Sequence, residues 1–396
     1  MEEPAAMLQG IRILDLTGVV FGPYATQILA DLGAEVIKVE APGSGDQYRW
    51  TAKAAKTPGM SPGFLSLNRG KKSVVLDLKI EEDKAVIRAL IPTADVFILN
   101  VRGKAAERLG LDYDSVRAIR PDIIYAHCVG FGQDGPYAGL QAYDDVIQAA
   151  TGTTSLLSRV DGNPAARYLP SLVADKVAGL HAAYAVLAAI VHKLRTGRGQ
   201  KVEIPMLETF TSFMMTEHLG GQTFDPPNGP VGYFRQIDPD RQPFPTSDGY
   251  VSLVAYTDEA WPRLFTLLGN PEFLDDPRFE TRRLRVQHMP DMYREVARLT
   301  PQFTSADLLA RCQAAQIPAM IARDLGEVMD DPHLQQTGFF ERVEHPSEGG
   351  WIRMRHPVRF SDFEAGGGHA PRHGEHGDDV RAEAAARAAK RGAKLG

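Results

Sequence analysis

The sequence contains little cysteine, since only Cys128 and Cys312 occur among 396 residues. Two cysteines are too few for the disulfide framework that supports many secreted proteins. The first residues, 1–6, show neither the basic segment nor the hydrophobic core of a secretory signal. We therefore expect a cytoplasmic protein.

Long hydrophobic runs and an excess of positive charge are also missing. The longest apolar candidate, 178–191, is interrupted by Gly179 and His181 and falls short of the ~20 residues that cross a bilayer. The net charge is -6 and the pI is about 6.0. These values argue against nucleic acid or a membrane as the main partner.

Alternating patterns in the first half predict a parallel sheet. Residues 11–16 read as a strand, 24–32 as a helix with Pro23 at its first position, and 35–40 as a second strand after Gly33. Such a βαβ unit places its strands parallel. Further strands are expected at 73–78, 95–99 and 122–129, with a helix at 81–90. The sequence therefore predicts an α/β fold, with a Rossmann-like doubly wound parallel sheet in a large domain.

A proline-rich break between Phe224 and Asp248 interrupts these patterns. After it we expect a strand at 249–255 and helices at 261–268, 292–299 and 305–315, which form a smaller α+β domain. A strand at 351–355 and a helix at 378–395 follow. The predicted domains are 1–224, a large Rossmann-like domain, 225–330, the linker and small domain, and 331–396, a return to the large domain with a C-terminal helix.

Several motifs of other enzyme classes are incomplete. Residues 130–135 match G-x-G-x-x-G, but Pro136 follows and no helix opens there. Gly70-Lys-Lys-Ser73 lacks the glycine that a phosphate-binding loop needs, because Leu65 stands in its place. There is no H-E-x-x-H and no metal-ligand spacing among the histidines. We expect no metal site and no tightly bound cofactor.

His127 and Cys128 are adjacent, but neighbours in a strand point to opposite faces and cannot form a dyad. Asp175 is more informative, because it is a lone acid in the apolar segment 171–190. Two interpretations are open from the residues alone. Asp175 is either the N-cap of a helix over 176–194, or a reacting carboxylate kept dry by its apolar neighbours. His181 faces elsewhere on that helix.

Several segments together resemble the family III CoA-transferases. They are the loop 14–23, Ile37-Lys-Val-Glu40 with Gly43-Ser-Gly-Asp46, Leu67-Asn-Arg-Gly-Lys-Lys-Ser73, Ala94-Asp-Val-Phe-Ile-Leu-Asn100, Thr196-Gly-Arg-Gly-Gln200 and Gly374-Glu-His-Gly-Asp378. The resemblance spans nearly the whole chain. It implies a transferase that moves CoA between carboxylic acids, with an acyl-CoA thioester and a carboxylic acid acceptor as substrates and with Asp175 as the nucleophile.

The resemblance also implies which residues face CoA. They are Val20, Phe21, Lys71, Lys72, Leu76, Asp77, Leu78, Lys79, Asn100, Val101, Arg102, Arg108, Val129, Gly130 and Tyr143. The lysines and arginines suit the nucleotide phosphates. The chain departs from the family pattern at Val20, Ala41 and Val129. Members of this family form interlocked homodimers, so we expect a homodimer here.

Two alternatives remain. The α-methylacyl-CoA racemases share this family, but they place a histidine where this chain has Tyr143. Tyrosine is a less suitable base than imidazole at neutral pH, because its reference pKa is near 10 and the phenol is almost wholly protonated there. This substitution favours transfer over racemisation. A protein that binds acyl-CoA without turning it over is the second alternative, and the presence of Asp175 argues against it.

Overall fold

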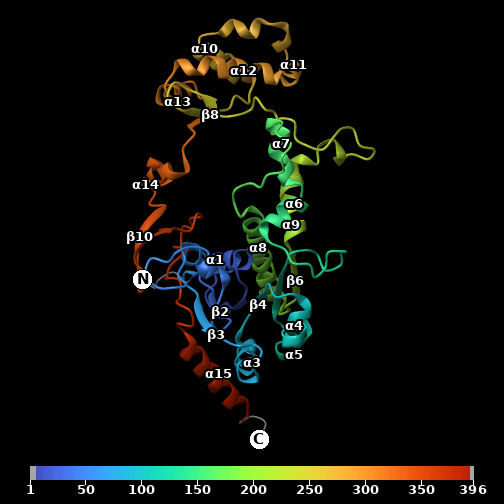
Figure 1. Ribbon diagram of the computed structural model, residues 1–396, viewed down its shortest axis with the longest axis vertical. Helices are drawn as coiled ribbons and strands as arrows, with labels where there is room; N and C mark the ends of the chain where they lie inside the picture. The colour runs from blue at the N-terminus through green and yellow to red at the C-terminus, as the bar shows by residue number, and fades with distance from the viewer. Residues whose placement is uncertain (1–5, 393–396) are drawn as a thin grey trace. The chain divides into compact units, whose positions relative to one another are not determined.

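The structure is a computed structural model in which residues 6–392 are described (Figure 1). The chain divides into two compact units. Unit 1 comprises Met1–Thr153, Tyr168–Met215 and His333–Gly396, and unit 2 comprises Thr154–Arg167 and Thr216–Pro332. The divisions thus fall at 215/216 and 332/333, and the segment 154–167 also joins the smaller unit.

Unit 1 is built on a six-stranded parallel sheet, which confirms the predicted α/β class. Its strands are β1 (Arg12–Leu16), β2 (Glu35–Glu40), β3 (Lys72–Val75), β4 (Val96–Leu99), β5 (Ile124–Val129) and β6 (Lys201–Pro205). Their order in the sheet is β3-β2-β1-β4-β5-β6. Strand order reverses between β1 and β4, which is the topological switch point of a doubly wound sheet.

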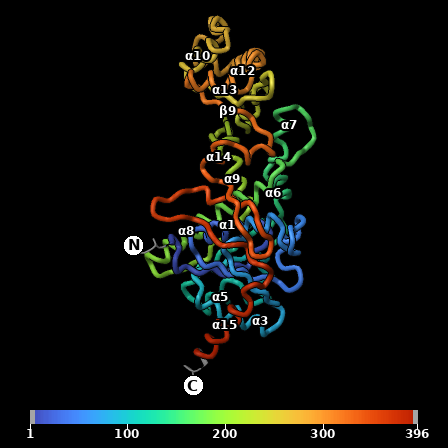
Figure 2. Tube along the Cα trace, turned by 90° about the vertical axis from the view of Figure 1, so that its left-hand side faces the viewer, coloured from blue at the N-terminus to red at the C-terminus, as the bar shows by residue number. Residues whose placement is uncertain are grey.

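Alternate side chains of the strands feed two separate cores. Ile13 and Ile98 pack on one face with α1 (Phe21–Asp31) and α8 (Val173–Thr196). Leu14 and Phe97 pack on the other with α3 (Glu81–Leu90), α4 (Gly103–Leu109), α5 (Tyr113–Ile119) and α15 (Gly377–Gly392). Figures 1 and 2 both show α3, α5 and α15 grouped away from α1 and α8. Helices therefore cover both faces of the sheet.

The remaining elements of unit 1 are short. They are α2 (Pro62–Asn68), α6 (Asp144–Ala150) and an antiparallel hairpin of β10 (Phe340–His345) and β11 (Gly349–Met354). Two helices cross the unit boundaries, α9 (Met206–His218) and α14 (Pro332–Gln336). Several predicted bounds shift: α1 begins at Phe21, β3 ends at Val75, and residues 393–395 of the predicted last helix lie outside the described residues.

Unit 2 has its own core around a three-stranded antiparallel sheet. The strands are β7 (Phe244–Pro245), β8 (Tyr250–Leu253) and β9 (Ala319–Ile321). The helices are α7 (Leu156–Asp161), α10 (Ala260–Leu267), α11 (Arg282–Gln287), α12 (Met289–Leu299) and α13 (Ser305–Ala314). Strand and helices together give the α+β character expected from the sequence.

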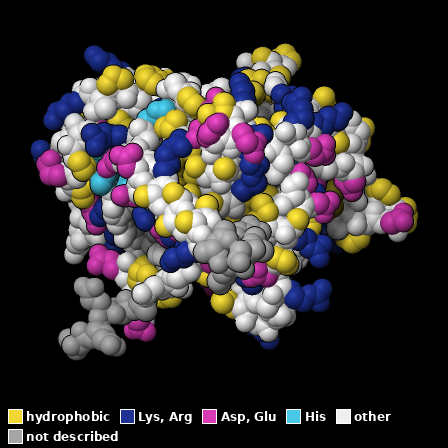
Figure 3. All heavy atoms as spheres, turned by 90° about the horizontal axis from the view of Figure 1, so that it is seen from below, with side chains coloured by type: hydrophobic (Ala, Val, Ile, Leu, Met, Phe, Trp, Pro, Cys, Tyr) yellow, Lys and Arg dark blue, Asp and Glu magenta, His cyan; other side chains and the backbone are white. Residues whose placement is uncertain are grey.

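By length and hydropathy, α8 alone among the described residues would suffice to cross a membrane. In the structure it supplies Ala174, Ala178, Val186 and Ile190 to a core of unit 1, as the central helix of a globular unit does. On the face seen in Figure 3, basic, acidic and apolar side chains are interspersed, without the continuous basic stripe typical of nucleic-acid binding.

Candidate active site

Two adjoining cavities open at the carboxyl ends of β1 and β4, which is where doubly wound sheets bind ligands. Both are lined by the loop residues Gly18 and Val19 after β1, and by Asn100 and Val101 after β4. Asn100 ties the two loops together, because its Oδ1 accepts from the N–H of Gly18 at 3.2 Å and its Nδ2 donates to the Gly18 carbonyl at 3.0 Å. The switch point is therefore the shared wall of both cavities.

The first cavity, of about 240 Å³, contains Asp175. Of the predicted site residues, those that line it are Phe21, Asn100, Val101, Arg102, Val129, Gly130, Tyr143 and Asp175. These residues come from α1, α8, the end of β5, the loop after β4 and the N-cap of α6. The fold thus brings together half of a set that is spread over more than 150 positions of the sequence.

Asp175 is the third residue of α8 and not its N-cap, so the capping interpretation is wrong. The cap position is Leu172, whose side chain cannot accept a hydrogen bond. Asp144, which belongs to α6, caps α8 instead. Its Oδ1 accepts hydrogen bonds from the backbone N–H groups of Ala174 at 2.7 Å and of Asp175 at 3.1 Å. Asp175 is therefore left free to face the cavity.

The environment of Asp175 favours its protonated form. Burial, followed by the charge of Asp144, raises the pKa of Asp175 to about 7, against a hydrogen bond from the Phe21 N–H that lowers it. Phe21 is the first residue of α1, so the carboxylate meets the positive end of that helix as well as its own. Such a group is partly ionised at neutral pH and poorly hydrated.

The contact between α1 and α8 depends on Gly179. A Cβ at this position would lie 2.9 Å from the Phe21 carbonyl oxygen and 3.0 Å from the Tyr24 ring. Glycine therefore allows the first turn of α1 to approach α8 one turn beyond Asp175. This close approach brings the Phe21 N–H within reach of the carboxylate.

The loop after β1 is conformationally strained. Val19 has a φ of 71°, in the left-handed region that β-branched residues rarely adopt. Its N–H donates to Asp46 Oδ1 at 2.9 Å, and Asp46 Oδ2 is paired with Lys38 Nζ at 2.8 Å. Lys38 Nζ also donates to the Thr17 carbonyl at 2.8 Å. A buried ion pair thus holds the turn that separates the two cavities.

The second cavity is larger, at about 620 Å³, and extends from the switch point to the segment after β3. Its predicted lining residues are Leu76, Asp77, Leu78, Lys79, Asn100 and Val101. Because β3 ends at Val75, these four residues after it form a loop and not the end of a strand. A long ligand could therefore occupy both cavities past Val19.

Four predicted residues lie away from both cavities. Val20 is buried at the N-cap of α1 and does not line either cavity. Its neighbour Val19 lines both cavities instead. Lys71 is fully buried, with its Nζ 2.8 Å from Thr26 Oγ1 and 3.4 Å from Asp15 Oδ2. Burial lowers the pKa of Lys71 to about 7.

The other two are surface residues. Lys72 pairs with Glu35 at 2.6 Å, and Arg108 is exposed in the last turn of α4. The expectation that the adjacent lysines 71 and 72 together meet phosphate is not supported by this geometry. Neighbours at the start of a strand point to opposite faces, and here one points into a core.

His127 and Cys128 point to opposite faces of β5, as predicted. His127 Nε2 lies 2.9 Å from the Val101 carbonyl oxygen, whereas Cys128 packs in the core on the side of α8. Burial raises the pKa of the Cys128 thiol, so it stays protonated although it borders the Asp175 cavity. Among the described residues no group of three His, Cys, Asp or Glu side chains is placed to hold a metal.

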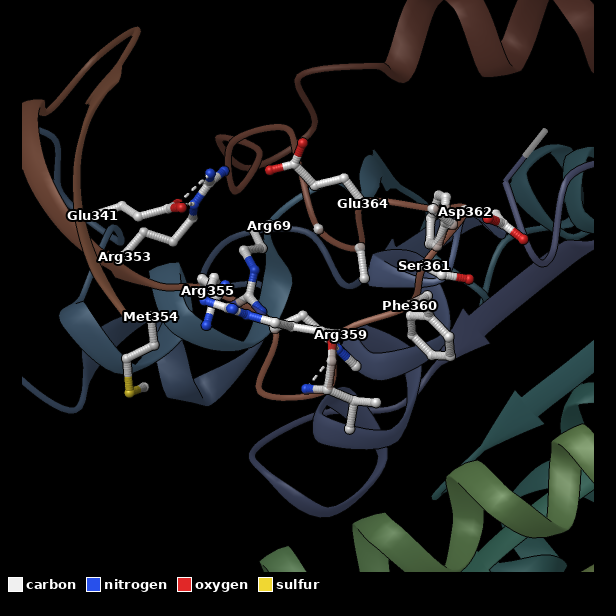
Figure 4. Close-up of a pocket in the computed structure, with 15 residues that line it drawn as sticks. Arg69, Glu341, Arg353, Met354, Arg355, Arg359, Phe360, Ser361, Asp362 and Glu364 are labelled. Atoms are coloured by element: carbon white, nitrogen blue, oxygen red, sulfur yellow. Dashed lines mark hydrogen bonds and ion pairs between the residues drawn. The ribbon is translucent and has the colours of Figure 1, made fainter. Parts of the chain in front are cut away.

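Another cavity of unit 1, of about 500 Å³, lies among residues 353–366 and contains none of the predicted site residues (Figure 4). Arg69, Arg355 and Arg359 lie together near its centre in Figure 4. Arg69 is paired with Asp31, and Arg353 with Glu341 at 2.6 Å. Two of its four lining arginines are therefore paired with acids.

Sequence reasoning missed Val19, Asp46, Tyr48 and Asp144. Burial, and next the charge of Asp175, raise the pKa of Tyr48, which places this phenol near the Asp175 carboxylate. The position of Gly18-Val19 directly after β1 was a usable signal, because ligands bind at the switch point. Asp144 was visible only as one acid of the pair 144–145.

Comparisons with known proteins agree with this geometry. The model of CoA-transferase family III matches residues 8–377. The succinate–glutarate CoA-transferase of Agrobacterium fabrum is 34% identical over 95% of this chain and 95% of its own length. The formyl-CoA:oxalate CoA-transferase of Escherichia coli is 31% identical over 93% of each chain.

Solved structures give the same result. The crystal structure of Rv3272 from Mycobacterium tuberculosis has a TM-score of 0.83 at 31% identity and covers 96% of this chain and 100% of its own. A CAIB/BAIF family protein from Brucella suis has a TM-score of 0.81 at 30% identity, with the same coverage. Since both the family match and these relatives span nearly the whole length, the chain belongs to CoA-transferase family III.

Proposed function

We propose that this CoA-transferase moves CoA between two carboxylic acids through covalent intermediates on Asp175. The observation that carries the proposal is the buried carboxylate of Asp175, which borders a cavity, receives the Phe21 N–H and has a pKa of about 7. A carboxylate is a weak nucleophile in water, and removal of water makes it more reactive.

The reaction has two symmetric halves. A carboxylate oxygen of Asp175 attacks the thioester carbonyl of the donor, the C–S bond breaks, and a mixed anhydride and CoA thiolate form. The thiolate attacks the Asp175 carbonyl carbon and releases the donor acid, which leaves an aspartyl-CoA thioester. The acceptor carboxylate attacks this thioester and again expels the thiolate. The thiolate finally attacks the acceptor acyl carbon, so that acyl-CoA leaves and Asp175 is regenerated.

The surroundings of Asp175 suit these steps. The Phe21 N–H donates to the carboxylate and, in the tetrahedral intermediates at the Asp175 carbonyl, can stabilise the developing oxyanion. Asp144 holds the first turn of α8 through two backbone hydrogen bonds, and so positions Asp175 without touching the substrate. Both roles use groups that are already in place before substrate binds.

For CoA itself we propose the second cavity, with Leu76, Asp77, Leu78 and Lys79 along one side. The pantetheine arm would then pass the Gly18-Val19 turn toward Asp175. Arg102 borders the first cavity and Lys79 the second, and both are cations that can pair with anionic groups of the substrates. The relatives named for succinate and glutarate, or for formyl-CoA and oxalate, support carboxylic acids as donors and acceptors.

Racemisation is less well supported, because it needs an acid and a base on opposite sides of the substrate α-carbon. The titratable side chains that line the first cavity are Arg102, Cys128, Tyr143 and Asp175. None of the described lining residues is a histidine. Transfer needs only one carboxylate and is therefore the better fit.

A homodimer is part of the proposal. Leu180, Tyr184, Val191 and Leu194 expose half or more of their surface along one side of α8, which is an unusually apolar stripe for a solvated helix. A second copy of this chain would cover it. Sedimentation as a monomer at micromolar concentration would contradict this part.

The central experiment is intact-protein mass spectrometry after incubation with succinyl-CoA, glutaryl-CoA and longer acyl-CoA thioesters. We expect a CoA-sized adduct that hydroxylamine removes. The adduct should be lost in Asp175→Ala and retained in Asp145→Ala, a matched control in the first turn of α6. Absence of an adduct, together with exchange of the substrate α-proton for solvent deuterium, would instead assign the chain as a racemase.

A further inference from the structure

Unit 2 contains a small cavity that the proposed CoA chemistry does not use. Its volume is about 120 Å³, and it lies between the segment before β7, the end of β8 and the helices α10 and α12. Phe244, Trp261 and Tyr293 form an aromatic wall, and each is less than a tenth exposed. The ring centroids of Phe244 and Trp261 lie 6.4 Å and 6.5 Å from that of Tyr293.

Arg235 lines this cavity, and not all of its hydrogen-bond donors have a partner. Its Nε is buried and has no hydrogen-bond partner among the described residues. One terminal nitrogen is 3.4 Å from the Tyr293 hydroxyl, which is a long contact, and the guanidinium stacks 4.8 Å above the Tyr256 ring. Buried donors in native proteins are nearly always paired, so an unpaired guanidinium N–H calls for a partner from outside the chain.

The charges around the cavity have one sign. Arg235 and Arg241 line it, and none of the described lining residues is an aspartate or a glutamate. Arg241 donates to the Gln236 side chain at 2.7 Å, and the nearby Asp240 is already paired with Arg294. The cavity therefore combines an available cation with an aromatic wall.

We propose that this cavity is a binding site for a small carboxylate with a short aliphatic chain. The planar guanidinium of Arg235 matches a carboxylate in a two-point contact, and the aromatic wall buries the aliphatic part. The volume corresponds to about four water molecules, which limits the ligand to a short acid. The proposal concerns unit 2 alone and holds whether or not Asp175 is a nucleophile.

The test uses Trp261, which borders the cavity, as a local reporter. The full-length protein carries three tryptophans, so Trp50→Phe with Trp351→Phe leaves Trp261 as the single emitter. Its fluorescence is titrated with butyrate, with the neutral isostere butyramide and with inorganic phosphate. We expect a saturable change with butyrate only. Loss of one charge-assisted contact should weaken it about tenfold or more in Arg235→Gln.

Two further variants keep the result interpretable. Arg263→Gln removes an exposed arginine of α10 and should leave butyrate binding unchanged. Tyr293→Phe keeps the aromatic wall, loses one hydroxyl and should weaken binding only a few fold. The titration needs neither CoA nor turnover, and repetition in Asp175→Ala separates it from the active site. Equal affinity for butyrate in Arg235→Gln, no saturation by butyrate, or equal binding of butyramide or phosphate would each overturn the proposal.

Discussion

The backbone N–H of Asp175 donates a hydrogen bond to the side chain of Asp144 at 3.1 Å, so one acid caps the helix that presents the other. The two carboxylates come from different helices, α6 and α8, and both are buried. Asp144 thereby fixes the position of Asp175 and also raises its pKa through like-charge repulsion. Position and proton affinity are set by the same neighbour.

Replacement of Asp144 by asparagine separates these two effects. Asparagine keeps a side-chain oxygen for the N–H groups of α8 but removes the negative charge. We expect the pKa of Asp175 to fall, so that the acid limb of the kcat/KM profile moves to lower pH. The exposed Asp145→Asn, one residue away, should leave the profile in place. An unmoved acid limb in a folded Asp144→Asn protein would show that burial alone sets this pKa.

Replacement of Asp175 by asparagine should stabilise the protein in a pH-dependent way. The pKa of Asp175 is raised from 3.8 to about 7 in the folded state, so ionisation above pH 7 opposes folding. The penalty is absent below about pH 4, grows as the pH rises toward 7 and is complete above it. We expect Asp175→Asn to be more stable than wild type by roughly 2–4 kcal/mol at pH 8 and equally stable at pH 4. Urea unfolding at the two pH values measures the difference, and equal effects at both would contradict it.

Gly179→Ala should be harmful despite the high helix propensity of alanine. In a solvent-exposed helix, replacement of glycine by alanine stabilises the helix by about 1 kcal/mol. Here the added Cβ would meet the Phe21 carbonyl at 2.9 Å, so α1 must shift. We expect a loss of about 1–3 kcal/mol and a lower kcat, because the Phe21 N–H moves away from Asp175. Gly377→Ala at the start of α15, where a Cβ meets nothing within 4 Å, is the control and should keep its activity.

Val19→Gly should raise the stability of the protein and lower its activity. Glycine adopts a positive φ without strain, so we expect the variant to gain up to about 1 kcal/mol in the free energy of unfolding. The turn would lose the side chain that lines both cavities, and kcat/KM should fall. Gln316 is the other described non-glycine residue with a positive φ and lies in unit 2. Gln316→Gly should gain stability with unchanged activity, and a parallel loss of activity there would show that the Val19 effect is not local.

Periodicity predicted five of the six strands in the sheet of unit 1, but it did not predict β6, whose sequence Lys201-Val-Glu-Ile-Pro205 is not a continuous apolar run. The bounds of β2 and α3 agree with the sequence to the residue. The prediction for 73–78 overran, since Leu76 is as apolar as a strand residue but lies in the loop that lines a cavity. A hydrophobic pattern indicates that residues are buried. Residues beside a cavity can be as buried as residues within a strand, so the pattern does not tell the two apart.

Charged residues were predicted less well than apolar ones. Lys71 reads as a surface cation beside Lys72, yet the tertiary structure encloses it with Asp15 and Thr26. Sequence alone cannot foresee this, because the partners are 45 or more positions away and come together only when α1 packs on the sheet. The same holds for Lys38 and Asp46 beneath the Val19 turn.

The fold class, the family resemblance and the choice of Asp175 follow from the amino-acid sequence alone, because these depend on local periodicity and on motifs read in order along the chain. Packing is what makes Asp144 and not Asp175 the cap of α8, brings Val19 and not Val20 to the cavities, and leaves the Nε of Arg235 without a hydrogen-bond partner among the described residues. Each of these depends on distances between segments that are remote in sequence, and burial and hydrogen bonding are settled only once those segments are packed.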